Sequence, residues 1–235
     1  MAILFHVNNV SGPTPPISGP PTEIDNCILW LRSDAGITKD ESNLVSLWED
    51  QSGNNNHASQ SNNTLKPIWA ATGANGNPML NFTAQNLDLN SIITGTQEVF
   101  IIYKAAGASA TTKFLTKDSS YLGMYHEPGY LEVTTRVDVV TTDDNTNYYG
   151  AYSDHIWLNF NFRIQDMGGW VNAVTVCGGL TLAESADLAG ACESEDIGNA
   201  ESNGGIAEII VYSSILSSED RTTLNSYLNT RYGTT

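Results

Sequence analysis

The sequence has few positive charges. Its 235 residues include 10 Lys and Arg residues against 26 Asp and Glu residues, which gives a formal net charge of −16 at pH 7. Binding of DNA or RNA depends largely on cations that neutralise phosphates, and an acidic surface repels nucleic acids and anionic lipid leaflets. We therefore expect no nucleic-acid partner. An acidic surface promotes solubility and leaves divalent cations or neutral glycans as candidate ligands.

Cysteine is also scarce. The 3 Cys residues do not form the dense disulfide framework of a small secreted domain, and no CxxC or His/Cys spacing indicates a zinc site. Cys27 lies in an apolar run, which predicts a buried free thiol. Cys177 and Cys192 flank one loop, and whether they pair in an oxidising environment is left open by the sequence.

Long apolar runs are absent. No stretch approaches the roughly 20 apolar residues that a membrane-spanning helix needs, so we expect no membrane insertion. The opening segment MAILFHVNNV has neither a basic region nor a small-residue cleavage site after it, so we expect no signal peptide and predict assembly in a cytoplasm. The chain length and the 40% share of hydrophobic residues suit one large domain with one core.

Proline is concentrated near the N-terminus. Five of the 8 Pro residues lie in one short segment: Pro13, Pro15, Pro16, Pro20 and Pro21. Proline fixes φ and lacks an N–H donor, so we expect residues 1–23 to form an extended arm and residues 24–235 to form the domain. The arm is either a plain linker or a tether that docks on another subunit.

Beyond the arm, short apolar runs alternate with clusters of Gly, Asn, Asp and Ser, a pattern typical of many strands joined by turns. The predicted strands are residues 27–31, 44–48, 79–82, 99–103, 114–117, 130–133, 156–164, 169–176 and 206–212. Only the end of the chain has helical spacing, from a candidate N-cap at Ser217 through Leu224 and Leu228 to a stop at Gly233. One short helix after many strands predicts an all-β sandwich with a helix against it.

Three stretches resemble the LamG-like branch of the concanavalin A-like lectin/glucanase superfamily. They are LWLRSDAGITKDESNLVSLWEDQSGNNNHASQ (residues 29–60), GNPMLNF (residues 76–82) and GGIAEIIVYSSILSSEDRTTLNSYLNTRYG (residues 204–233). The resemblance implies an antiparallel jelly-roll β-sandwich with a short C-terminal helix. The family includes glycan-binding modules, glycosidases and structural parts of viruses, so the fold does not choose among these functions.

The residues argue against an enzyme. Glycosidases of this superfamily carry paired carboxylates on one strand, whereas the only dense acidic stretch here, ESEDIGNAE (residues 193–201), has no aromatic residues nearby to form a sugar platform. Glu193 and Glu195 are the candidate pair if hydrolysis occurs at all. Glu208 lies alone in an apolar strand, which favours a structural hydrogen-bond acceptor over a catalytic acid.

Two binding sites are candidates. Asp50, Asn54 and Asn56 offer oxygen ligands to Ca²⁺, the one cofactor we consider, although the same residues also suit a turn that bonds only to itself. Tyrosine rings can stack on the apolar faces of sugars. The candidate glycan-binding residues are Tyr121, Tyr125, Tyr148 and Tyr149.

These features lead to a main hypothesis and two alternatives. We expect a non-enzymatic bacteriophage virion protein, a capsid decoration or tail-appendage subunit, whose arm binds other virion proteins and whose outward domain contacts host surface glycans. We also expect it to form a homo-oligomer. The first alternative is a carbohydrate-binding module of a bacterial cell-surface or secreted protein, and the second is a glycoside hydrolase.

Overall fold

The computed structural model describes residues 20–93, 97–105, 110–117, 120–127, 130–136, 145–148, 158–165, 168–176, 180–182, 194–198 and 203–233. Within these ranges, eight strands form one sheet: β1 (Cys27–Arg32), β5 (Ile68–Ala70), β6 (Met79–Thr83), β8 (Gln97–Ala105), β13 (Leu158–Gln165), β14 (Gly168–Val176), β15 (Leu180–Leu182) and β17 (Asn203–Tyr212).

Nine strands of the described residues form the second sheet. They are β2 (Ile37–Lys39), β3 (Val45–Trp48), β4 (Ala58–Ser59), β7 (Asn86–Ile93), β9 (Ala110–Lys117), β10 (Ser120–Glu127), β11 (Tyr130–Arg136), β12 (Asn145–Tyr148) and β16 (Ser194–Gly198). The helices are α1 (Pro20–Glu23), the 3₁₀ helix η1 (Ala74–Gly76) and α2 (Ser218–Tyr232).

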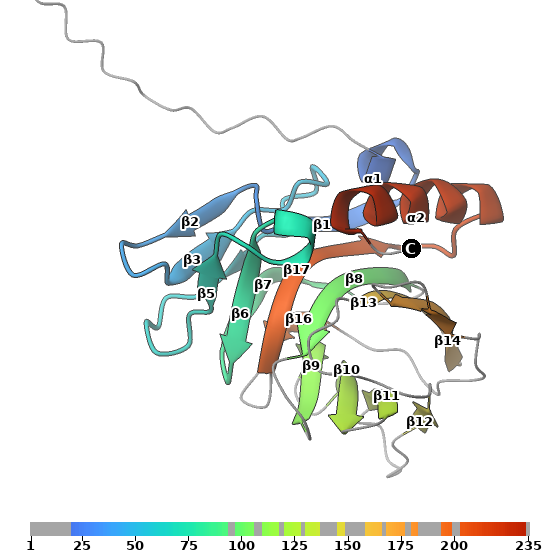
Figure 1. The fold of residues 1–235 in the computed structure, drawn as a ribbon. Coiled ribbons are helices and arrows are strands. Elements are labelled where there is room, and N and C mark those ends of the chain that lie inside the picture. The colour runs from blue at the N-terminus through green and yellow to red at the C-terminus, as the bar shows by residue number, and fades with distance from the viewer. Residues whose placement is uncertain are drawn as a thin grey trace, which may run out of the picture.

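The strand order is β15-β14-β13-β8-β17-β6-β5 in the first sheet and β12-β11-β10-β9-β16-β7-β4-β3-β2 in the second. The first half of β17 pairs with β6 and its second half pairs with β1, while β8 runs along its other edge. All these pairings are antiparallel, and Figure 1 shows the two layers with α2 above them. The predicted all-β sandwich with a C-terminal helix is confirmed.

Strands β8 and β17 are buried on both faces, which explains their nearly continuous apolar sequences. Phe100 and Ile210 belong to the apolar cluster beneath α2, together with Leu224 and Leu228 of the helix. Because side chains alternate along a strand, their equally buried neighbours, such as Ile101, face the other sheet. The helix therefore closes a second core on the outside of the first sheet.

The C-terminal helix begins and ends where the sequence predicts. The side chain of Ser217 accepts a hydrogen bond from the backbone N–H of Asp220, and Gly233 ends the helix with φ 68°. A left-handed φ at the C-cap favours glycine, because other residues are strained there. None of the helices in the described ranges is long and apolar enough to cross a membrane.

The structure differs from the predicted arm at its end. Pro20 and Pro21 begin the short helix α1 instead of continuing in an extended conformation. Pro21 is buried, and its carbonyl accepts a hydrogen bond from the hydroxyl of Tyr212 at 3.1 Å. Proline suits the first turn of a helix because the N–H it lacks would have no partner there. Pro13, Pro15 and Pro16 lie outside the described residues.

Candidate functional site

The centre of the helix–sheet interface is a buried carboxylate, Glu208 of β17. Its side chain accepts hydrogen bonds from the indole of Trp30 at 2.5 Å and from the hydroxyls of Tyr232 at 2.6 Å and Tyr227 at 2.9 Å. The guanidinium of Arg231 approaches within 3.6 Å. The predicted role of Glu208 as a hydrogen-bond acceptor agrees with these contacts, which tie β1 and β17 to α2.

Burial controls the titration of this network. Complete burial raises the pKa of Glu208, and the hydrogen bonds from Tyr232 and Trp30 oppose this rise without cancelling it. The pKa of Tyr227 and that of Tyr232 are both raised, because burial and the neighbouring Glu208 charge disfavour phenolate. Because Glu208 is buried, the network offers no exposed carboxylate to a ligand.

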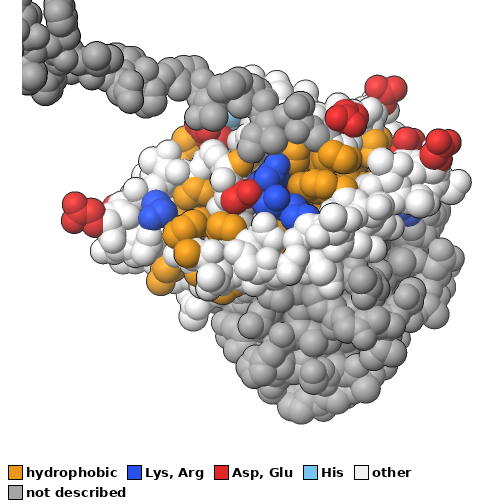
Figure 2. All heavy atoms as spheres, turned by 45° about the horizontal axis from the view of Figure 1, so that its top comes forward, with side chains coloured by type: hydrophobic (Ala, Val, Ile, Leu, Met, Phe, Trp, Pro, Cys, Tyr) orange, Lys and Arg blue, Asp and Glu red, His pale blue; other side chains and the backbone are white. Residues whose placement is uncertain are grey.

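Above this network lies an open groove, which we call the helix groove, with a volume of about 930 Å³. Its described lining residues come from α1, from η1 and the residue that follows it, and from α2: Pro20, Asn75, Asn77, Thr222, Thr223, Ser226, Tyr227, Thr230 and Arg231. Most are neutral hydroxyl or amide side chains. Figure 2 turns the side of the molecule that carries α2 toward the reader, and it shows basic side chains gathered beside acidic and apolar ones on this face.

One wall of the groove is fixed by two asparagines around η1. The side-chain amides of Asn75 and Asn77 both donate to the backbone carbonyl of Arg231, at 3.1 and 2.9 Å. Carbonyls in the last turn of a helix have no partner within the helix, so these amides satisfy a group that would otherwise need water. Asn75 adopts a left-handed φ of 50°, which asparagine tolerates better than most residues.

Tyr227 forms the aromatic part of the groove. Its ring is half-buried and packs edge-on against the indole of Trp30, with 6.5 Å between ring centroids. Its hydroxyl points inward to Glu208, so the orientation of the ring is fixed by the buried network. Thr223, Ser226 and Thr230 are exposed beside it and recur on one side of α2, because positions three and four apart share a helix face.

Arg231 is the only charged side chain among the described lining residues. Its Nη2 donates to Asp34 at 2.6 Å and its Nε donates to the hydroxyl of Tyr232 at 3.0 Å. Asp34 also accepts two hydrogen bonds from Arg32, at 2.9 and 3.1 Å. Burial alone would raise the pKa of Asp34, but the bonds from Arg32 and Arg231 outweigh burial and lower it, so Asp34 is ionised at neutral pH.

The predicted Ca²⁺ ligands form a closely bonded turn. The carboxylate of Asp50 is almost fully buried and accepts hydrogen bonds from Trp30 N–H, from Asn56 N–H, and from both the N–H and the hydroxyl of Ser52. The side-chain amides of Asn54 and Asn56 donate to the carbonyls of Cys27 and Ile28. The described residues contain no group of three His, Cys, Asp or Glu side chains suited to a metal ion. Calcium binding at this turn stays a prediction.

The predicted tyrosines lie away from the helix groove. Tyr121 and Tyr125 belong to β10 and Tyr148 belongs to β12, in the second sheet. Tyr125 and Tyr148 both stand opposite Glu132 of the intervening strand β11. Tyr149 lies outside the described residues. The backbone register therefore brings two of the candidates near each other, and their binding of glycans stays a prediction.

The remaining candidates fall mostly outside the described ranges. Cys177, Cys192 and Glu193 are not among the described residues, and Glu195 is described only as a backbone position in β16. No sequence pattern predicted the helix groove. Its only sequence signal is the row of hydroxyl residues on α2 between the buried leucines, and that row by itself resembles any solvent-facing side of a helix.

No protein-family model and no curated protein matches the chain. Among solved structures, the binding domain of Paraclostridial Mosquitocidal Protein 1 matches 87% of this chain and 53% of its own, with a TM-score of 0.52 and 13% identity. Trypanosoma rangeli sialidase matches 88% of this chain and 33% of its own, with a TM-score of 0.56 and 14% identity.

A third structure is matched over nearly its whole length. Domain 4 of AbnA, a GH43 extracellular arabinanase from Geobacillus stearothermophilus, in complex with arabinotriose, matches 85% of this chain and 98% of its own, with a TM-score of 0.52 and 14% identity. At such identities the likeness shows the fold alone. The chain spans about half of the mosquitocidal binding domain and a third of the sialidase. The more specific LamG-like assignment stays a prediction.

Proposed function

We propose that the protein is a carbohydrate-binding module and that the helix groove is its binding site. The observation that carries this proposal is the lining of the groove: exposed hydroxyl and amide side chains around a half-buried tyrosine ring. Sugar rings offer an apolar face for stacking and hydroxyl groups for hydrogen bonds, so they suit this combination. A volume of about 930 Å³ accommodates a short oligosaccharide.

The rigidity of the groove supports this proposal. Tyr227 and Arg231 line the groove and also contact Glu208 beneath it. Asn75 and Asn77 are held by their bonds to the end of α2. Side chains that are already ordered lose little conformational entropy when a ligand binds, so a preformed site gains affinity.

The structural neighbours are consistent with sugar binding. The matched arabinanase domain is described in complex with arabinotriose, and the chain covers 98% of that domain. The fold is therefore shared with an independent domain that holds a neutral oligosaccharide. This supports the carbohydrate-binding alternative from the sequence more than the virion hypothesis.

We also propose that the module has no hydrolytic activity. Retaining hydrolysis needs two carboxyl groups about 5 Å apart at the scissile bond. The described lining residues of the groove include no Asp or Glu, and Glu208 and Glu98 are buried and bonded to other parts of the chain. This proposal is tested by incubating the chain with any glycan it binds and measuring release of reducing ends.

A glycan array with the full chain tests the binding proposal, followed by calorimetric titration with the best ligands. The blocking variant is Ser226→Lys, which places a long side chain in the groove. Its matched control is Ser42→Lys, at an exposed serine near the β2–β3 turn. We expect Ser226→Lys to lose binding while Ser42→Lys keeps it. Equal binding by both variants, or no binding by the wild type, would refute the groove as the site.

The virion hypothesis stays a prediction. It depends on the N-terminal arm, of which residues 1–19 are not described, and the comparisons give no link to a bacteriophage. A position on the cell surface or outside the cell accords with glycan binding and with the extracellular arabinanase among the neighbours.

A further inference from the structure

We infer that Asp34 restricts the helix groove to neutral oligosaccharides by holding the guanidinium of Arg231. This inference rests on the proposed function, because it concerns the selectivity of the same groove. Its starting point is that Arg231 is the only cationic side chain among the described lining residues. Of these lining residues, only Arg231 could form an ion pair with a carboxylate on a bound sugar.

Arg231 is already committed to groups of its own chain. Asp34 accepts from its Nη2 at 2.6 Å, the hydroxyl of Tyr232 accepts from its Nε at 3.0 Å, and Glu208 lies 3.6 Å from the same Nε. The guanidinium also stacks over the ring of Tyr232, at 5.2 Å from the centroid. Arginine binds a carboxylate best through two parallel N–H donors, and these contacts occupy donors on Nε and Nη2, the two nitrogens of one such edge of the guanidinium.

The surrounding charges favour the same selectivity. Asp34 joins Arg231 and Arg32, so its carboxylate offsets one of the two positive charges of this cluster. Glu219 and Asp220 stand in the first turn of α2, and the whole chain carries a formal net charge of −16. An anionic sugar is therefore repelled as it approaches, whereas a neutral sugar loses nothing by the absence of a free cation.

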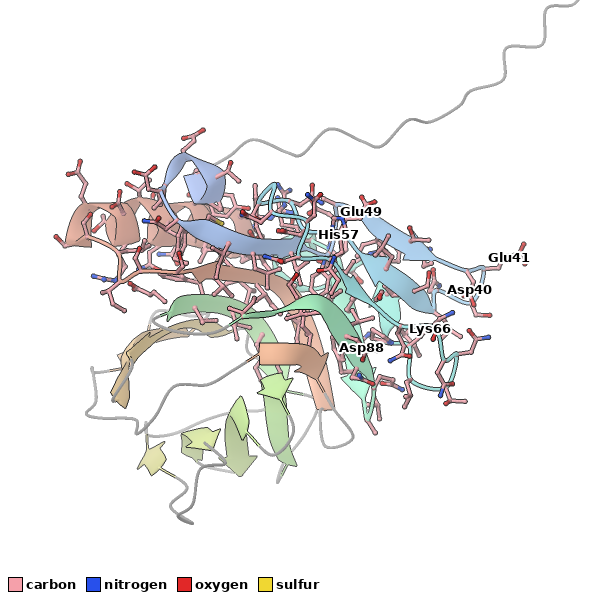
Figure 3. All side chains as sticks on the ribbon, turned by 180° about the vertical axis from the view of Figure 1, so that it is seen from behind. Asp40, Glu41, Glu49, His57, Lys66 and Asp88 are labelled. Carbon is pink, nitrogen blue, oxygen red and sulfur yellow. The ribbon has the colours of Figure 1, made fainter. Side chains whose placement is uncertain are left out.

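Removing the charge of Asp34 should release this restriction. Asp34→Asn keeps the size of the side chain but replaces one acceptor oxygen with an amide donor, which cannot bind a guanidinium. The matched control is Glu41→Gln, which removes one negative charge at an exposed position. Figure 3 shows Glu41 at the tip of the β2–β3 hairpin, at the opposite end of the domain from α2.

The experiment is calorimetric titration of the full chain with two sets of probes: neutral pentose and hexose trisaccharides, and trisaccharides of uronic acids. We expect the wild type to bind its best neutral probe at least about tenfold more tightly than any acidic probe, the effect of one charge-assisted hydrogen bond. Asp34→Asn should raise the ratio of acidic to neutral affinity about tenfold, while Glu41→Gln should leave the ratio unchanged. The double variant Asp34→Asn, Arg231→Gln should lose the gain.

Each result decides a question. Tight binding of acidic probes by the wild type would overturn the neutral selectivity while leaving the carbohydrate-binding proposal intact. A folded Asp34→Asn variant without the gain, or an equal gain in Glu41→Gln, would overturn the role of Asp34. No binding of either probe set, together with an empty glycan array, would overturn the proposed function itself. If Asp34→Asn does not fold, as circular dichroism would show, the selectivity of the wild type still tests the inference.

Discussion

The two roles of Tyr227, as part of the groove and as a donor to Glu208, can be separated by mutation. Tyr227→Phe keeps the ring but removes the hydroxyl that donates to the buried carboxylate at 2.9 Å. Removing one hydrogen-bond partner of a buried polar group costs about 1–3 kcal/mol of unfolding free energy. We expect this loss of stability with little change in glycan affinity, because the sugar would meet the ring and not the hydroxyl.

Tyr227→Ala removes the ring as well. The ring packs against the apolar cluster beneath α2 and edge-on against Trp30, so we expect a stability loss on the order of 3–5 kcal/mol, similar to other losses of a large aromatic side chain. Glycan affinity should fall by roughly 2- to 12-fold, which corresponds to about 0.5–1.5 kcal/mol of aromatic stacking. Both variants should therefore lose stability, whereas only Tyr227→Ala should lose glycan affinity.

Urea denaturation at neutral pH measures the stabilities, and calorimetric titration with the best array ligand measures the affinities. Tyr232→Phe is the control, because it removes a donor to the same carboxylate from a tyrosine that is almost fully buried and outside the groove lining. If Tyr227→Phe lost as much affinity as Tyr227→Ala, the ring would not be the sugar platform. If Tyr227→Phe and Tyr232→Phe both kept wild-type stability, the network would not support the helix.

Other predictions concern the core, the buried charges and the turn. Leu228→Ala should lower the unfolding free energy by about 2–5 kcal/mol in urea denaturation, because the Leu228 side chain is fully buried between α2 and the first sheet. Arg221→Met should cost about 3–5 kcal/mol in the same assay, because it leaves the buried Glu98 without its ion-pair partner. The raised pKa of Glu208 means that the folded state holds its proton more tightly than the unfolded state, so this group's stabilising effect is complete below about pH 4.3 and is lost as the pH rises through the folded pKa. Unfolding free energies of the wild type and of Glu208→Gln are measured by urea denaturation from about pH 4.3 upward. The wild-type value minus the variant value should fall as the pH rises, and a difference that does not change with pH would contradict the prediction. Because the carboxylate of Asp50 already accepts hydrogen bonds from the chain, Ca²⁺ and a chelator should give melting temperatures within about 1 °C of each other, and a larger rise with Ca²⁺ would support a metal site.

Some of the strands that the sequence predicted share a physical property. Residues 99–103 and 206–212 are apolar because they lie in the middle of the first sheet, where both faces are covered, and residues 27–31 pair with the second half of β17. Of the missed strands, β2, β4 and β5 have only two or three residues each, so they carry little periodicity, whereas β7 and β10 were missed although they have eight residues each. The helix α2 was found because its caps and its spacing of leucines are local signals.

The site was less accessible to sequence reasoning. Asp50 and its asparagines form a loop in which the polar groups lie close in sequence, so their grouping was visible in advance. The helix groove instead joins Pro20, residues 75 and 77 in and after η1, and residues of the C-terminal helix. Asn75 and Asn77 reach Arg231 across more than 150 sequence positions, and no local pattern predicts such a contact.

The sequence by itself determined the architecture, because alternation of apolar residues, turn residues and helix caps act over a few neighbours and each points to the same sandwich and terminal helix. It also indicated that Glu208 needed polar partners, since a carboxylate in an apolar strand cannot be buried without them. Only the tertiary structure decided which partners these are and what lies above them. Pairing of β1 with β17 and packing of α2 across both bring Trp30, Tyr227 and Tyr232 to one carboxylate, and the groove exists because these distant segments meet there.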